Sequence, residues 1–283
     1  MTTIIGIAVS TTPLFFASLG ALLTEFAGVL GIFIEGFMNM GAFLSYFFMI
    51  KTNSVLIASC LTIVLCASAG WGLARFVAVS DANPFIVGLA VNLAADGLTS
   101  TLSYAWSGTR GVLRNTTGLD MARFLPFFAY IAIGCFAAVW FIAYRTRVGL
   151  RLRIVGASAQ FAAERGFDAT RFTAGAWSIA AMFAAIAGAC LTFRVGAYTP
   201  GGASGRGWIA LATVFLGFRR VWGTALAALF FALVERASII AQGLNVLSGT
   251  VLLGLPSLLA LVFYTLSCIV KELKKGKEGK HEV

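Results

Sequence analysis

Charged residues are scarce in this 283-residue chain. Only 11% of the residues are charged and 59% are hydrophobic, whereas about 25% of the residues in a typical soluble domain are charged. With a mean hydropathy of +0.92, this composition indicates an integral membrane protein. The apolar runs are long and continuous instead of alternating over short segments, so they predict membrane-spanning helices and not a β-barrel.

Residues with the chemistry for catalysis or metal binding are also few. The single histidine, His281, lies in the polar tail, which excludes histidine-based catalysis within the membrane. The cysteines lie in apolar runs without Cys-x-x-Cys or Cys/His spacing, so we expect no zinc site and no disulfide framework. They are expected to pack as small buried hydrophobic side chains, and they are Cys60, Cys66, Cys135, Cys190 and Cys268. We predict neither catalytic residues nor metal ligands.

Two further absences limit the function. The sequence contains no G-x-x-x-x-G-K-[ST] motif, so we expect no P-loop ATPase activity and no bound cofactor in this chain. The net charge of +10 lies beside apolar spans, where positive residues orient helices and meet anionic lipid headgroups. We therefore expect membrane lipid, and not nucleic acid, to be its charged partner. The N-terminus lacks a basic region and a signal-peptidase site, so the first apolar run is expected to be retained.

Apolar runs of sufficient length predict an all-α polytopic protein with about eight to ten transmembrane helices. The predicted domains are one transmembrane domain over residues 1–270 and a basic cytoplasmic tail over 271–283, which carries five lysines. The predicted spans cover residues 4–23, 24–50, 55–79, 83–106, about 123–144, 173–193, 208–218, 221–241 and 251–269. The helix starting at Asn83-Pro84 has proline at a favourable first position.

A polar segment, residues 145–172, interrupts the apolar sequence near its middle. It carries six arginines against two acidic residues, so it is predicted to face the cytoplasm. Within it, Ser158 can cap the start of a helix and Gly166 can end it, which predicts a two-turn helix from Ala159 to Arg165. Because so short a helix is marginal alone in water, we expect it to dock on a soluble or peripheral protein.

Polar residues also occur inside the predicted spans. Glu25 and Glu35 lie in a glycine-interrupted stretch, and such breaks at membrane depth are tolerated where they line a cavity. Glu25 could instead lie in a loop at headgroup level, and Glu35 could make a bond between helices. A polar stripe on one helix face could likewise be interhelical contact or the lining of a translocation path; it consists of Asn92, Asp96, Thr99 and Ser103.

A second broken crossing is predicted near the C-terminus. The run from Trp208 to Phe218 is too short to cross alone, yet two cytoplasmic ends require an even number of crossings between residue 172 and the tail. It must therefore cross together with the glycine-rich stretch before it, which leaves Arg219 and Arg220 inside. Broken helices in both halves are typical of transporters built from a repeat. A gradient-driven transporter could use Glu35 and Asp96 as ion sites, whereas an ATP-driven permease needs the cytoplasmic helix at residues 159–165.

The chain also resembles a known family. Four segments carry the likeness, in the family's order, over roughly residues 11–235: TPLFFASLGALLTEFAGV with IEGFMNMGAF, NPFIVGLAVNLAADGLTS, TRVGLRLRIVGASAQFAAERGF and GGASGRGWIALATVFLG. It is similar to permease subunits of bacterial ABC importers of the branched-chain amino acid, ribose and nucleoside superfamily, most closely the nucleoside type that works with a lipoprotein.

The resemblance implies a coupling helix in the central segment that docks on a separate ATPase. The residues predicted for this coupling are Ser158, Phe161, Ala162, Glu164, Arg165 and Gly166. It also implies a solute path formed by the broken helices and the polar helix, with Glu35, Asn39, Asn92, Asp96 and Thr99 predicted to line it. Asp96 stands where the family usually has an apolar residue. The family's G-E-N-P before the coupling helix is here G-A-S-A, in which serine can replace asparagine as the cap.

The partners implied are two ATPase subunits that bind ATP, a second copy of this permease or a related one, and an extracytoplasmic substrate-binding lipoprotein. The implied location is the bacterial inner membrane, with several passes. The implied solute is a purine nucleoside, with riboflavin, a sugar or a branched-chain amino acid as alternatives. A gradient-driven secondary transporter is the alternative from another class.

Overall fold

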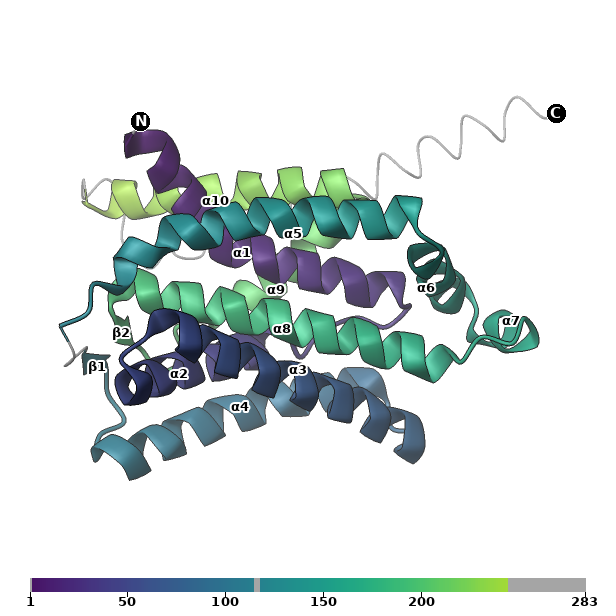
Figure 1. The fold of residues 1–283 in the computed structure, drawn as a ribbon, viewed down its shortest axis with the longest axis horizontal. Helices are drawn as coiled ribbons and strands as arrows, with labels where there is room; N and C mark the ends of the chain where they lie inside the picture. The colour runs from purple at the N-terminus through teal and green to yellow at the C-terminus, as the bar shows by residue number, and fades with distance from the viewer. Residues whose placement is uncertain (1, 115–117, 244–283) are drawn as a thin grey trace.

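The computed structural model describes residues 2–114 and 118–243, which are almost entirely helical (Figure 1). The helices are α1 Thr2–Phe26, α2 Ile34–Thr52, α3 Val55–Ser80, α4 Pro84–Ser107, α5 Leu125–Arg145, α6 Arg147–Ala157, α7 Ala159–Glu164, α8 Ala169–Val195, α9 Arg206–Leu216 and α10 Val221–Gly243. A 3-10 turn, Met121–Phe124, and two short strands, β1 Leu113–Arg114 and β2 Ala197–Tyr198, complete them. The predicted all-α class is confirmed.

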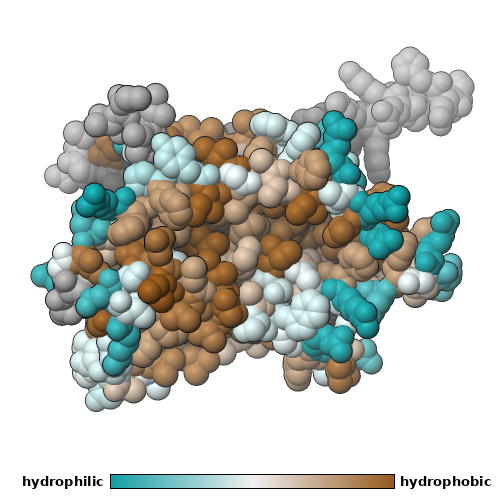
Figure 2. All heavy atoms as spheres, viewed as in Figure 1, coloured by the Kyte–Doolittle hydropathy of each residue, from teal (hydrophilic) through white to brown (hydrophobic). Residues whose placement is uncertain are grey.

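Six of these helices, α1, α3, α4, α5, α8 and α10, are long and apolar enough to cross a membrane. Figure 2 shows the corresponding brown band of hydrophobic residues, with teal hydrophilic groups gathered toward the ends of the molecule. Helix α9, with 11 residues, is apolar but shorter than these six. The crossings predicted over residues 24–50 and through the glycine-rich stretch with α9 stay predictions. The chain is thus a multi-pass membrane protein. The predicted span over residues 251–269 and the lysine tail lie outside the described residues.

Helix α8 forms the centre of the bundle. Of its apolar span, 83% is buried inside the protein, compared with 22% for α4 and for α5. Small residues on α8 permit this, because they let neighbouring backbones approach closely. A Cβ added to Gly188 would lie 2.0 Å from the Met38 carbonyl oxygen of α2. A Cβ added to Gly70 of α3 would lie 2.6 Å from the Cβ of Ala181 on α8.

The two halves of the chain pack in a reciprocal way. Helix α8 packs against α2 and α3, and α1 packs against α9 and α10. Each half therefore begins with a long helix, a break and two further helices, and the long helix of each half packs against those two helices of the other; among the described residues, α4 and α5 follow in the first half alone. This arrangement agrees with the predicted repeat-like halves.

The two ends of the bundle differ. Helices α6 and α7 lie at one end, and the antiparallel pair β1 and β2 lies at the other (Figure 1). The turn after α9 is at the α6 end, because the Val221 N–H donates to the Tyr144 hydroxyl over 3.4 Å and Arg219 contacts Glu25. Arg219 and Arg220 therefore lie on the same side as the arginine-rich segment, as the parity argument predicted.

Helix α6, Arg147–Ala157, is a feature that the sequence did not predict, since this stretch reads as a basic loop. The Thr146 hydroxyl caps it by accepting the Gly149 N–H over 3.3 Å. Two glycines then fix it against the bundle. A Cβ at Gly149 would be 2.2 Å from the Ile142 carbonyl oxygen, and one at Gly156 would be 2.2 Å from that of Phe26. These close backbone contacts, together with the buried side chains of Leu152 and Val155, hold this helix in place.

Candidate solute path and coupling surface

The first break separates α1 from α2 and is held by one side chain of α4. The Asn92 amide nitrogen donates to the Ile32 carbonyl oxygen over 2.8 Å, and its amide oxygen accepts the Gly36 N–H over 2.7 Å. Asn92 is only 8% exposed. The break leaves backbone groups without helical partners, which is costly away from water. Asn92 satisfies two of them and so fixes where α2 begins.

The second break ends where α9 begins, directly against the start of α2. A Cβ added to Gly207 would lie 2.5 Å from the Glu35 Cβ, so only glycine permits this approach. The Glu35 carboxyl group faces the backbone N–H groups of Gly205, Gly207 and Trp208. Both helices thus direct their N-termini, the positive ends of their dipoles, to one point. The Glu35 Oε2 atom is buried there without a hydrogen-bond partner among the described residues.

Asn39 connects the two breaks. Its amide nitrogen lies 2.5 Å from Asp96 Oδ1 of α4, and its amide oxygen accepts the Ala203 N–H of the glycine-rich stretch over 3.1 Å. Asn39 is buried, with 2% of its surface exposed. One side chain of α2 therefore holds both the polar helix and the second break.

Thr99 lies one turn further along α4. Its hydroxyl donates to the Ala95 carbonyl oxygen over 2.8 Å, and the residue is 2% exposed. Tyr198, in the glycine-rich stretch, lies near Thr99 and Asp96. Tyr198 was not predicted as a site residue, although an aromatic residue within a glycine-rich break is a signal that could have indicated it.

All the residues predicted for the path, Glu35, Asn39, Asn92, Asp96 and Thr99, thus lie around the meeting point of the two breaks. Asn39, Asn92 and Asp96 hydrogen-bond between segments in this conformation. Contact between helices is therefore one role of the polar stripe, and lining of a path stays a prediction.

A charged cluster beyond this point was not predicted. Arg206 donates to Glu235 over 2.6 Å and to the Gly202 carbonyl oxygen over 2.9 Å. Arg194 lies between a cavity of about 370 Å³, bordered by Glu235 and Arg236, and one of about 230 Å³, bordered by Gly202 and Arg206. Arginine and glutamate within apolar spans are the sequence signal that could have indicated this cluster.

Helix α7 has the predicted caps. The Ser158 hydroxyl accepts the Phe161 N–H over 3.2 Å, and Gly166 adopts the left-handed conformation with φ of 77°. The Phe167 N–H donates to the Ala162 carbonyl oxygen over 2.9 Å, as in a Schellman ending. The helix ends at Glu164, one residue before the predicted end.

Helix α7 also projects from the α6 end of the bundle (Figure 1). Ala162 is fully buried against the protein, whereas Phe161 is 45% exposed. The Arg165 guanidinium lies over the Phe161 ring at 5.0 Å, and Glu164 is exposed beside it. The outer face of α7 therefore presents an aromatic ring, a cation and an anion to the solvent.

A helical membrane bundle with paired breaks, whose helix N-termini meet inside it, is an architecture of transport proteins. The model of the family described as "Branched-chain amino acid transport system / permease component" matches residues 3–264. The chain belongs to this family of permeases.

Curated relatives include transport components with different solutes in their names. A putative glucose ABC transporter permease of Haloferax volcanii is 30% identical over 83% of this chain and 76% of its own length. A guanosine ABC transporter permease of Bacillus subtilis is 28% identical over 82% of this chain and 80% of its own. A nucleoside ABC transporter permease of Lactococcus lactis is 25% identical over 81% and 80%. No solved structure matches the chain significantly.

Proposed function

We propose that this chain is the permease subunit of an ATP-driven importer of a purine nucleoside in a bacterial inner membrane. Membership of the permease family, with a guanosine and a nucleoside permease among the relatives, is the observation that carries the proposal. The proposed partners are two ATPase subunits, a second permease chain, identical or related, and an extracytoplasmic binding lipoprotein. The ATPase subunits bind and hydrolyse ATP, and this chain makes and breaks no covalent bond.

The coupling surface supports the ATP-driven mechanism. Closure of the ATPase subunits pushes α7, and α6 transmits the movement to the first break through the close contact of Gly156 with Gly28. The breaks then change between outward-open and inward-open states, as rigid bundles do in alternating access. The solute passes where Asn39, Asp96 and Glu35 meet, and their amide and carboxyl groups offer hydrogen bonds to a heterocycle.

Replacing Phe161 and Arg165 together with alanine tests the coupling. We expect ATP-dependent uptake to fall at least tenfold and the ATPase to dissociate during purification, because the outer face of α7 is lost. Arg171→Ala is the matched control: Arg171 is 76% exposed and pairs with Asp168 outside α7, and its uptake should be unchanged. Normal assembly and uptake in the double variant would refute the coupling role.

The gradient-driven alternative is favoured by one observation, the unpaired buried oxygen of Glu35. The two mechanisms separate in proteoliposomes that contain this chain without an ATPase. Our proposal predicts no accumulation of solute under a proton or sodium gradient, and accumulation under either gradient would contradict it.

The solute can be identified on the binding lipoprotein. We expect guanosine to raise the melting temperature of that lipoprotein, whereas glucose, riboflavin and leucine should not. A shift with glucose alone would assign the solute named for the Haloferax volcanii relative and reject the nucleoside.

A further inference from the structure

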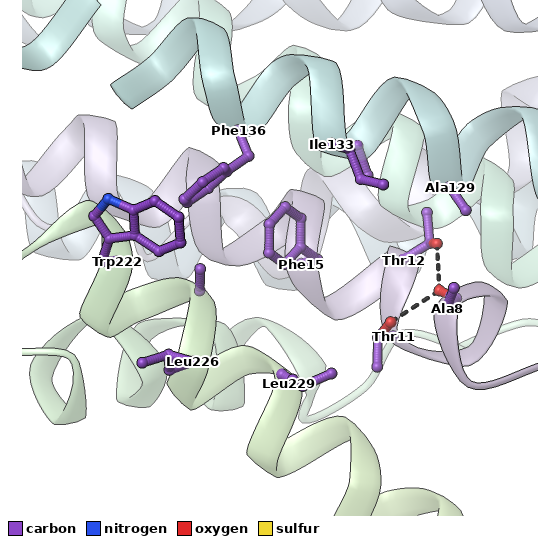
Figure 3. Close-up of a pocket in the computed structure, with 12 residues that line it drawn as sticks. Ala8, Thr11, Thr12, Phe15, Ala129, Ile133, Phe136, Trp222, Leu226 and Leu229 are labelled. Carbon is purple, nitrogen blue, oxygen red and sulfur yellow. Dashed lines mark hydrogen bonds between the residues drawn. The ribbon is translucent and has the colours of Figure 1, made fainter. Parts of the chain in front are cut away.

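An apolar groove lies between α5 and α10, with α1 as its floor. Its volume is about 270 Å³, and its walls include Phe15, Ile133, Phe136, Trp222, Leu226 and Leu229. Figure 3 shows Ile133 and Phe136 directed into the groove from α5, and Leu226 and Leu229 along the α10 side. Ile133 is 65% and Leu226 64% exposed. The groove therefore opens on the hydrophobic surface of the bundle.

A second cavity, of about 860 Å³, adjoins the groove at the α6 end of the bundle. The end of α5 and the turn between α9 and α10 form it, and its lining includes Trp140, Tyr144, Gly217, Arg220 and Trp222. Trp222 lines both spaces, and its ring lies 4.8 Å from that of Phe136 in the groove. An aromatic and basic cavity thus continues into an apolar groove.

The cavity carries positive charge that the described residues do not neutralise. Arg220 is exposed, and no hydrogen bond or ion pair joins its guanidinium to any residue in 2–114 or 118–243. The adjacent Arg219, in contrast, pairs with Glu25 over 2.9 Å. Arg153 lies over the Tyr144 ring at 5.4 Å, so a second cation stands behind the aromatic wall. An anionic group is the complementary ligand for this cavity.

We propose that these two spaces form one binding site for an anionic phospholipid of the cytoplasmic leaflet. The phosphate lies against Arg220 between Trp140 and Tyr144, and one acyl chain lies along α5 and α10 in the groove. Tryptophan, tyrosine and arginine at the end of membrane helices are suited to headgroup level. A free phosphate would use the cavity alone, whereas the apolar continuation beyond Trp222 requires a ligand with a hydrocarbon chain.

Such a lipid would stabilise the turn that follows α9. The turn from Gly217 to Arg220 is attached to α5 by the hydrogen bond from Val221 to Tyr144, which is long at 3.4 Å. A headgroup that contacts Arg220 and Trp140 together adds a second connection between the same elements. The position of α9 would then depend on the composition of the inner leaflet.

Native mass spectrometry of the full chain, purified with any subunits that accompany it, tests the proposal. We expect phosphatidylglycerol to be retained about fivefold more than phosphatidylcholine, as one arginine near a membrane surface favours an anionic lipid by about that factor. Arg220→Gln should abolish this preference. Arg110→Gln, a change to an exposed arginine on the loop before β1, should preserve it. Equal retention of the two lipids by the unaltered protein, or an unchanged preference in Arg220→Gln, would overturn the proposal.

A second variant distinguishes a lipid from free phosphate. Leu226→Trp fills the groove from an exposed position, so it should lower the retention of phosphatidylglycerol severalfold while Arg220 stays in place. Inorganic phosphate at millimolar concentration should not displace the lipid from the unaltered protein. Undiminished retention in Leu226→Trp, or displacement by phosphate, would show a phosphate cavity without an acyl-chain site and refute the assignment.

Discussion

The two breaks in this bundle meet at one point but differ in how firmly they are held. The first is short, its residues Ile32 and Phe33 are buried, and Asn92 bonds it on both sides. The second runs from Gly196 to Gly205, and most of its residues from 201 to 205 are exposed, with Ala203 bonded to Asn39. Segments with few buried contacts open at lower free energy. We therefore expect the first break to act as a fixed support and the second to move.

The largest effect should come from removing the support of the first break. Asn92→Leu leaves the Gly36 N–H and the Ile32 carbonyl oxygen buried without a partner, at roughly 1–3 kcal/mol for each group. We expect the melting temperature of the purified protein to fall by several degrees and transport to be lost. Thermal denaturation in detergent measures the change.

The matched control for Asn92→Leu is Thr101→Ala on the same helix. The Thr101 hydroxyl is exposed and donates to the Gly97 carbonyl oxygen within its own helix, so its loss should be nearly neutral. Equal stability of the two variants would show that the first break does not depend on Asn92, and the contrast between the breaks would fail.

A smaller effect is expected where the two breaks meet. Gly207→Ala places a methyl group 2.5 Å from the Glu35 Cβ and 2.8 Å from its backbone nitrogen. Overpacking of this kind costs about 1–3 kcal/mol. Because most residues from 201 to 205 are exposed, we expect α9 to shift away, so transport should fall more than stability does.

Gly134→Ala on α5 is the control for this variant, since a Cβ there meets nothing within 4 Å. Alanine is also the better helix former, so Gly134→Ala should leave transport and stability unchanged or slightly raise stability. If Gly207→Ala lost as much stability as Asn92→Leu, the second break would be as rigid as the first.

Local signals in the sequence predicted much of this architecture. The capping residues bond to backbone groups within a few positions of themselves, so their effect can be read from the local sequence. Each begins or ends a helix as predicted: Asn83-Pro84, Ser158 and Gly166. The second break was predicted by counting membrane crossings between residue 172 and the tail, because a run as short as 208–218 cannot span a bilayer alone. Apolar length and glycine content together predict where a membrane helix is interrupted.

Contacts between distant segments could not be predicted in this way. Asn39 and Ala203 are 164 positions apart, and no pattern in either segment predicts that the two residues are in contact. The candidate path residues were found because they are polar at membrane depth, but their partners depend on how the two halves pack. Helix α6 was missed for a related reason: its glycines contact α1 and α5, and neither contact can be read from its own arginine-rich sequence.

The smallest effect should come from the ion pair that joins the last turn of α1, before the first break, to the turn that follows α9. Glu25 lies in the last turn of α1 before the first break, and Arg219 follows α9. Their side chains are 13% and 63% exposed and 2.9 Å apart. Because Arg219 is so exposed, solvent screens the pair, and such pairs contribute about 0–1 kcal/mol. We expect Arg219→Gln to shift the melting temperature only slightly, with a larger shift at low salt. The double variant with Glu25→Gln measures the coupling between the two residues, which should be near zero at physiological salt. A coupling above about 2 kcal/mol would exceed that range for exposed pairs, and it would mean that the turn after α9, and with it the far end of α9, is held firmly against α1.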